Sequence, residues 1–197
     1  MLALASFAVL PAAAQQKADP DWPCMQPKVP ELSAAAVWSG PEVDVKAFGW
    51  QEDKDVADLA SQLASRRVPV DDAVAALGKF VDGLATDQKA AKLSEAFVGA
   101  FQLLNRERDQ VMQGIDRYAR AQKGLAETIR ENQSRLSDLN SAGTDPQQIS
   151  ALTDEVTTQV RIFNDRRASL TYVCEVPTLI EQRLFTLAKA IQGKISG

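Results

Sequence analysis

The chain has 197 residues, a nearly balanced charge of 22 basic against 26 acidic residues, and no histidine. Without histidine, His-based acid–base catalysis, Ser/His/Asp triads, and most zinc or haem sites are excluded. The net charge of −4 is mild and offers neither the basic face that nucleic acid requires nor a polybasic patch for anionic lipid. We therefore expect no catalytic residues, no metal, no cofactor and no nucleic-acid partner.

Residues 1–14 have the pattern of a secretory signal peptide. An apolar run over residues 2–10 is followed by Pro11 and three alanines, a small-residue cleavage site of the A-x-A kind. A transmembrane helix would need about 20 apolar residues, and polar residues follow too early here. The usual basic start of a signal peptide is missing, so we expect the natural start codon to lie upstream. The mature chain is expected to be periplasmic or secreted, without a transmembrane segment.

Residues 15–52 are expected to form an extended N-terminal strap. Five prolines forbid a long helix there, and a short helix is predicted only over 33–38. Trp22, Trp38 and Trp50, together with Val37 and Phe48, carry too much apolar surface to remain in water. We expect this strap to pack along the helices, and an aromatic recognition patch is the alternative.

The two cysteines, Cys24 in the strap and Cys174 far downstream, are expected to form a disulfide. An even number of cysteines in an oxidising compartment favours this pairing. The alternative is two unrelated buried thiols. A redox-active pair is disfavoured because no C-x-x-C motif is present.

A helical bundle is expected over residues 53–197. It begins with two short helices, the first over about 53–66 with acidic residues in its first turn, where they suit the helix dipole. The second is expected over about 71–83 behind an Asp71 cap, and Thr86 is expected to cap a third helix.

Two long helices are predicted over about 87–141 and 146–192. Ten of the thirteen heptad positions between Phe97 and Leu139 are apolar or tyrosine, which is typical of a coiled-coil seam. The apolar positions of the two stretches pair so that their numbers add to 288, as in Leu139/Ile149, Leu136/Leu152, Leu125/Phe163, Tyr118/Leu170, Leu104/Leu184 and Phe97/Ile191. The pairing predicts a long antiparallel hairpin with the short helices at its base. Residues 115–173 would then project as an arm, and Pro177 predicts a kink or break near residues 173–176.

The hairpin turn has specific residue signals. Gly143 suits a left-handed C-terminal cap, and Asp145 suits the next N-cap. Pro146 falls at the first helical position, and Gln148 falls where a capping box places its partner.

Polar residues interrupt the seam of the arm. The pairing places Gln122 opposite Arg166, Asn132 opposite Val156 and Gln159 opposite Ile129. Such residues lower coiled-coil stability and often set register or partner orientation. A partly solvated coil that tolerates them is one explanation. The other is that Gln122, Asn132, Gln159 and Arg166 form a partner-binding surface.

Two further candidates have ordinary structural explanations. An acidic group near the first helix could bind a hard cation, but it lacks the spacing of an EF-hand and suits a helix N-terminus; its members are Glu52, Asp53, Asp55 and Asp58. Four aromatics at the base could line a ligand pocket or simply form core, namely Phe80, Phe97, Phe101 and Phe185.

We conclude from the sequence that the fold is all-α and coiled-coil-like, and that no enzyme is indicated. The expected function is a non-enzymatic scaffold or adaptor that docks on another protein of the cell envelope, with self-association left open. The alternative is a binding module for a small apolar or amphipathic ligand.

Overall fold

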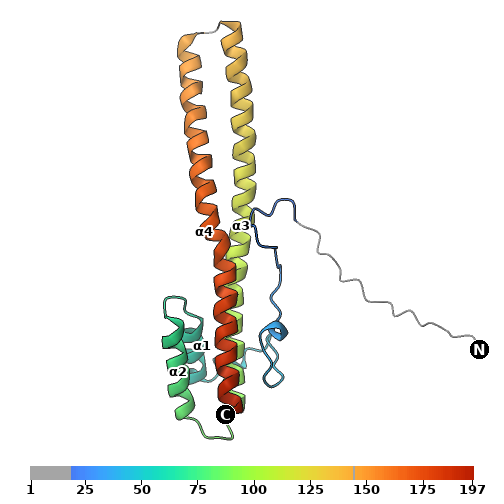
Figure 1. The fold of residues 1–197 in the computed structure, drawn as a ribbon, viewed down its shortest axis with the longest axis vertical. Helices are drawn as coiled ribbons and strands as arrows, with labels where there is room; N and C mark the ends of the chain where they lie inside the picture. The colour runs from blue at the N-terminus through green and yellow to red at the C-terminus, as the bar shows by residue number, and fades with distance from the viewer. Residues whose placement is uncertain (1–18, 144) are drawn as a thin grey trace, which may run out of the picture.

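The computed structural model describes residues 19–143 and 145–197, and this part of the chain contains helices and no strand. The expected signal peptide and the first residues of the strap, 15–18, lie outside the described residues. Two short 3-10 helices are followed by two short and two long α-helices (Figure 1). The fold is therefore all-α.

The two long helices, α3 (Lys89–Ala142) and α4 (Pro146–Ser196), pack against each other and run in opposite directions (Figure 1). Gly143 ends α3 with the positive φ of 65° that the sequence predicts for it. The Asp145 carboxylate accepts a hydrogen bond from the Gln147 backbone N–H, and Pro146 occupies the first turn of α4. The Asp145 carboxylate thus caps the helix at Gln147 and not at Gln148. The Gln148 side chain forms no hydrogen bond with Asp145 in the described part, so the expected capping box is absent although Asp145 is the N-cap.

The short helices, α1 (Lys54–Ala64) and α2 (Val70–Asp82), flank the lower half of the long pair (Figure 1). Asp53 caps α1 as its acidic start suggests, accepting from the N–H groups of Asp55 and Val56. The expected Asp71 cap is wrong. Helix α2 begins earlier because the carbonyl of Pro69 accepts the first helical bond, at 3.0 Å from the Ala73 nitrogen.

The expected Thr86 cap of α3 is also wrong. A turn, in which the Gln88 N–H bonds to the Ala85 carbonyl at 3.0 Å, lies between α2 and α3. The first helical hydrogen bond then runs from Lys92 to the Gln88 carbonyl, so α3 begins two residues later than predicted.

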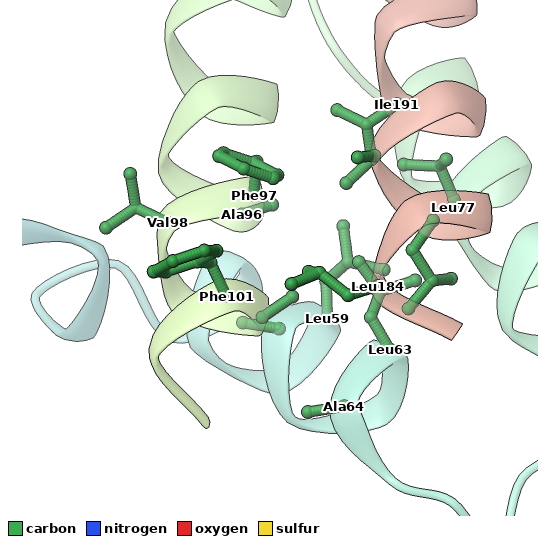
Figure 2. Packing of buried hydrophobic residues seen from close by; sticks show 14 of the residues in the cluster. Leu59, Leu63, Ala64, Leu77, Ala96, Phe97, Val98, Phe101, Leu184 and Ile191 are labelled. Atoms are coloured by element: carbon green, nitrogen blue, oxygen red, sulfur yellow. The ribbon is translucent and has the colours of Figure 1, made fainter. Parts of the chain in front are cut away.

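The hydrophobic core lies at this lower end, which we call the base. Apolar side chains from all four α-helices meet there, as Figure 2 shows for Leu63 of α1, Leu77 of α2, Phe97 of α3 and Leu184 of α4. All four are fully buried. Helix α1 contacts mainly α3, while α2 contacts α1 and α4. The long helices are thus held by neighbours at the base, and further along they contact mainly each other.

One glycine permits the closest approach in the base. A Cβ at Gly99 of α3 would lie 2.7 Å from the Ala60 Cβ and 2.8–2.9 Å from the Trp50 ring. Because real Cβ atoms do not approach so closely, α1 and the strap reach α3 at this point only because residue 99 has no side chain.

The strap, residues 19–52, runs along the side of the long helices opposite α1 and α2 (Figure 1). It contains η1 (Ala34–Ala36), shorter than the helix expected over 33–38, and η2 (Gly49–Gln51). Trp38 and Trp50 are buried, and the Trp38 ring stacks on Phe97 with centroids 4.0 Å apart. Phe48, which we expected to be covered, is 57% exposed because it lies outside these contacts.

Of the kink or break expected near residues 173–176, the break does not occur, because helix α4 continues through Pro177. Pro177 is itself buried, and burial of an apolar ring favours folding, whereas the absence of its N–H removes a helical hydrogen bond. No described helix combines the length and hydropathy needed to cross a membrane.

Candidate functional site

The strap is fastened covalently to α4 at the point where the base gives way to the arm. Cys24 and Cys174 form a disulfide, with an S–S distance of 2.02 Å and Cα atoms 5.5 Å apart, across 150 residues of sequence. The predicted pairing is therefore confirmed. We call this region, where the strap crosses α3 and α4, the junction.

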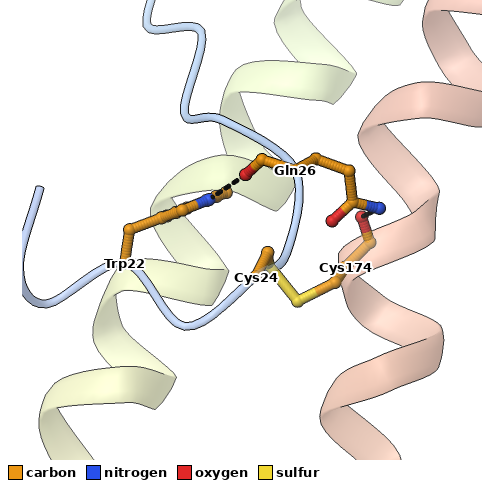
Figure 3. Close-up of a disulfide and its surroundings, with 4 residues drawn as sticks. All are labelled: Trp22, Cys24, Gln26 and Cys174. Carbon is orange, nitrogen blue, oxygen red and sulfur yellow. Dashed lines mark hydrogen bonds between the residues drawn. A yellow bond between two sulfur atoms is a disulfide. The ribbon is translucent and has the colours of Figure 1, made fainter. Parts of the chain in front are cut away.

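Two hydrogen bonds hold the strap in shape around the disulfide (Figure 3). The Trp22 indole N–H donates to the Gln26 carbonyl at 2.7 Å, and the Gln26 amide donates to the Cys174 carbonyl at 3.2 Å. Cys174 lies three residues before Pro177, in the turn where the proline disturbs the hydrogen-bond ladder of the helix. The strap thus offers a donor to the backbone of that turn.

Arg108 of α3 joins three segments at the junction. Its side chain is 1% exposed, and its Nε donates to Glu181 of α4 at 2.6 Å while Nη2 donates to the Val29 carbonyl of the strap at 2.6 Å. Nη1 has no hydrogen-bond partner in the described part and lies 3.9 Å from Asp109. In the sequence, Arg108 stands out as a charged residue at an apolar position of the heptad seam. The heptad pattern alone does not reveal that its partners are Glu181 and Val29.

Lys28 provides a second ionic link between the strap and α3. Its Nζ lies 2.9 Å from Asp116 and 2.8 Å from Asp19, and 5.3 Å from the centre of the Trp22 ring. Hydrogen bonding to Asp116, followed by Asp19, raises the pKa of Lys28 above its ordinary value. Sequence reasoning missed this lysine because the strap has no periodicity from which contacts can be derived.

Arg183 of α4 anchors the short helices to the long pair. It is 7% exposed, and it donates to the carbonyls of Leu63 at 2.8 Å and Val68 at 2.8 Å. These carbonyls lie in the last turn of α1 and in the loop before α2, where helix ends leave acceptors unpaired. Burial, then the charge of Arg66, lowers the pKa of Arg183. This residue was also missed by the sequence analysis.

The polar seam residues of the arm make contacts within the molecule. Gln122 is buried and its amide donates to the Phe163 carbonyl at 3.1 Å. Asn132 donates to Glu155 and to Gln159, at 3.2 Å in each case. The Gln122 amide thus reaches the α4 backbone, and no hydrogen bond between the Gln122 and Arg166 side chains occurs among the described residues.

Arg166 has an exposed side chain, and only its carbonyl takes part in the seam. That carbonyl accepts a hydrogen bond from the Tyr118 hydroxyl at 2.7 Å. The structure therefore does not gather Gln122, Asn132, Gln159 and Arg166 into one surface. The first three bond across the seam, while the Arg166 guanidinium points to solvent.

The four aromatics considered for a ligand pocket do not converge. Phe97 and Phe101 are buried in the core, with ring centroids 5.9 Å apart, and Phe80 is partly buried at its edge. Phe185 is 54% exposed because it follows Leu184 and therefore faces away from the core. Three of the four aromatics therefore belong to the core, which was the other explanation for them, and Phe185 does not.

Two of the four acidic residues near α1 have partners in the structure. Asp53 caps the helix and pairs with Lys92 at 2.7 Å, and Asp58 pairs with Lys54. Hydrogen bonding to Lys92, followed by the Val56 N–H, lowers the pKa of Asp53. Among the described residues no group of three or more potential ligands is placed to hold a metal ion.

No protein-family model, no curated protein and no solved structure gives a significant match to this chain. The function is therefore inferred from the residues themselves.

Proposed function

We propose that this protein is a non-enzymatic scaffold or adaptor of the cell envelope, secreted or periplasmic, that docks on another envelope protein. Its working form is a long antiparallel hairpin that stands on a small helical base and is held at mid-length by the N-terminal strap.

The junction is the observation that carries this proposal. A disulfide, an arginine buried to 1% exposure and the ion pair of Lys28 with Asp116 all fasten one short strap segment to the long helices. So many links at one level hold the root of the arm in a fixed direction. A rigid projecting arm suits a protein that holds other proteins in position, because a rigid surface loses little conformational entropy when it binds.

The proposed location is supported by two features. Disulfides persist in oxidising compartments, such as the periplasm and the extracellular space. Residues 1–14 have the composition of a signal peptide, as described above. Removal of that segment would leave Cys24 close to the new N-terminus.

Site-specific photo-crosslinking in intact source cells tests the proposal. A photoreactive residue is placed separately at four exposed positions on different parts of the molecule: Met25 at the junction, Arg130 on the arm, Ser150 near the turn and Lys79 on the base. We expect an adduct with a defined envelope protein from one or two neighbouring positions. When the reaction is repeated on isolated envelopes, an excess of the chain without the photoreactive residue should reduce the amount of this adduct. No adduct at any position, or the same adducts at all four, would refute the adaptor role.

A further inference from the structure

A cavity of about 380 Å³ lies beside the disulfide, between the strap and α4. Its strap side includes Met25 and Gln26, and its α4 side includes Arg167, Leu170, Cys174 and Glu175. The four α4 residues fall on one face of the helix, because they are spaced by about one and two turns. Figure 3 shows the strap at this level, with Cys24 bonded to Cys174 and Gln26 beside it.

Along α4 the residues that line the cavity run from Arg167 through Leu170 to Cys174 and Glu175, so side chains of opposite charge lie at the two ends of this stretch. Met25 is 100% exposed in a segment that the disulfide holds in place, and Leu170, which lines the same cavity, is half-buried. Arg167 and Glu175 are exposed, and neither has an ion-pair partner in the described part of the chain. Eight residues separate them, which corresponds to about 12 Å along the helix axis.

This spacing matches an extended peptide. In an extended chain the side chains at positions i, i+2 and i+4 point to the same side, and four residues span about 13 Å. An acidic residue, an apolar residue and a basic residue at these three positions would face Arg167, Leu170 and Glu175 respectively.

We propose that this cavity binds an extended segment of a partner protein with the pattern acidic–x–apolar–x–basic, in either chain direction. The acidic side chain pairs with Arg167, the basic side chain pairs with Glu175, and the apolar side chain packs on Met25 and Leu170. The inference rests on the proposed adaptor function and names its docking surface. It moves that surface away from the arm seam, whose Gln122 and Asn132 already bond across the hairpin.

Methionine-methyl NMR of the full oxidised chain tests the site directly. The sequence contains three methionines, and beyond the leader only Met25 and Met112 remain. Met112 is 7% exposed and lies on α3 outside the cavity, so its signal is an internal control. The probes are the capped peptides Ser-Glu-Ser-Leu-Ser-Lys-Ser and its reverse, with a Gln-for-charge peptide and a Gly-for-Leu peptide as controls. We expect saturable shifts of the Met25 signal with at least one charged Leu peptide, and none of the Met112 signal.

Charge reversal then assigns the contacts. In R167E the peptide with one Glu and one Lys should bind at least fivefold more weakly, whereas a peptide with Lys at both positions should bind more tightly than it does to the unmodified chain. The matched control R166E changes the neighbouring exposed arginine, which is outside the cavity, and should leave both affinities unchanged.

Three results would overturn the inference. The first is no shift of the Met25 signal at millimolar peptide, and the second is equal effects of R166E and R167E on binding. The third is binding of the uncharged Leu peptide as tightly as the charged one, which would mark a site for small apolar ligands. The two proposals fail separately. If an envelope protein still crosslinks to the chain while these peptides do not bind, the adaptor role stands and only this docking surface is wrong.

Discussion

Replacing Gly99 with alanine should destabilise the base, although the same replacement elsewhere in α3 should stabilise the protein. Alanine is favoured over glycine in a helix interior by about 1 kcal/mol. At Gly99 the added Cβ would lie 2.7–2.9 Å from Ala60 and Trp50, so α1 and η2 must move away. Overpacking of this kind typically costs about 1 to 3 kcal/mol. Because the contacts are so short, we expect a net loss of about 1 to 2 kcal/mol for G99A.

Gly124 provides the matched control, because nothing lies within 4 Å of a Cβ built at that position of the same helix. G124A should therefore gain about 1 kcal/mol, which makes the difference between the two variants about 2 to 3 kcal/mol. Urea unfolding followed by far-UV circular dichroism and by tryptophan fluorescence measures both changes. The fluorescence reports the strap and the base, since all three tryptophans lie in the strap. Equal stabilisation by the two substitutions would show that the approach of α1 and the strap to Gly99 is not as close as described.

Three further changes test other contacts. R183M leaves the Leu63 and Val68 carbonyls without their donor and should lower the free energy of unfolding by about 2 to 4 kcal/mol. The control R166M, at an exposed position, should change it by less than about 0.5 kcal/mol. Equal urea midpoints for the two variants would contradict the anchoring role of Arg183. Q122L removes a buried amide whose Oε1 has no partner in the described part, so amide hydrogen exchange in the arm should slow, and faster exchange would contradict this. Because Asp53 has a lowered pKa in the folded state, its carboxylate stabilises the fold above the ordinary pKa of 3.8, and this stabilisation is lost as pH falls through the folded pKa. The difference in Tm between wild type and D53N should therefore shrink below about pH 4. A difference that stays constant with pH would refute this role of Asp53.

The regular parts of this fold could be predicted because periodicity specifies them. The long helices follow from heptad spacing, and the disulfide follows from an even cysteine count in a chain with a leader-like start. Gly143 and Asp145 could be assigned to their cap positions because few residue types suit those backbone conformations.

The polar contacts were harder to predict, because a heptad pattern assigns a residue to a layer and does not say which atom a flexible side chain reaches. Gln122 shares its predicted layer with Arg166 but bonds to the Phe163 backbone, about one helical turn away. Arg183 lies between seam residues, and its acceptors belong to a helix end far away in sequence. Phe185 was grouped with the aromatics that could line a pocket or form core, although its position after Leu184 turns it outward.

Only the disulfide of the candidate site could be predicted from the sequence; the cavity beside it could not. Cys24 and Cys174 could be paired by count, and Cys174 could be placed near the turn that Pro177 disturbs. The cavity beside them forms between an irregular segment and a helix, and the path of an irregular segment has no repeating pattern that fixes its neighbours. For this reason Met25 and Arg167 became candidates only once the strap was seen lying on α4.

The 150-residue separation of the disulfide also constrains the order of folding. A chain is made from its N-terminus, so Cys24 is present as a free thiol while α1, α2, α3 and the first half of α4 are still being synthesised. The long helices can close progressively from their turn, where partners are near in sequence, toward the base, where they are far apart. Closure that reaches the junction brings Cys174 beside Cys24. Closure of the hairpin therefore favours this bond, whereas a chain oxidised before Cys174 has been made would have to use a partner outside itself, because it has only two cysteines.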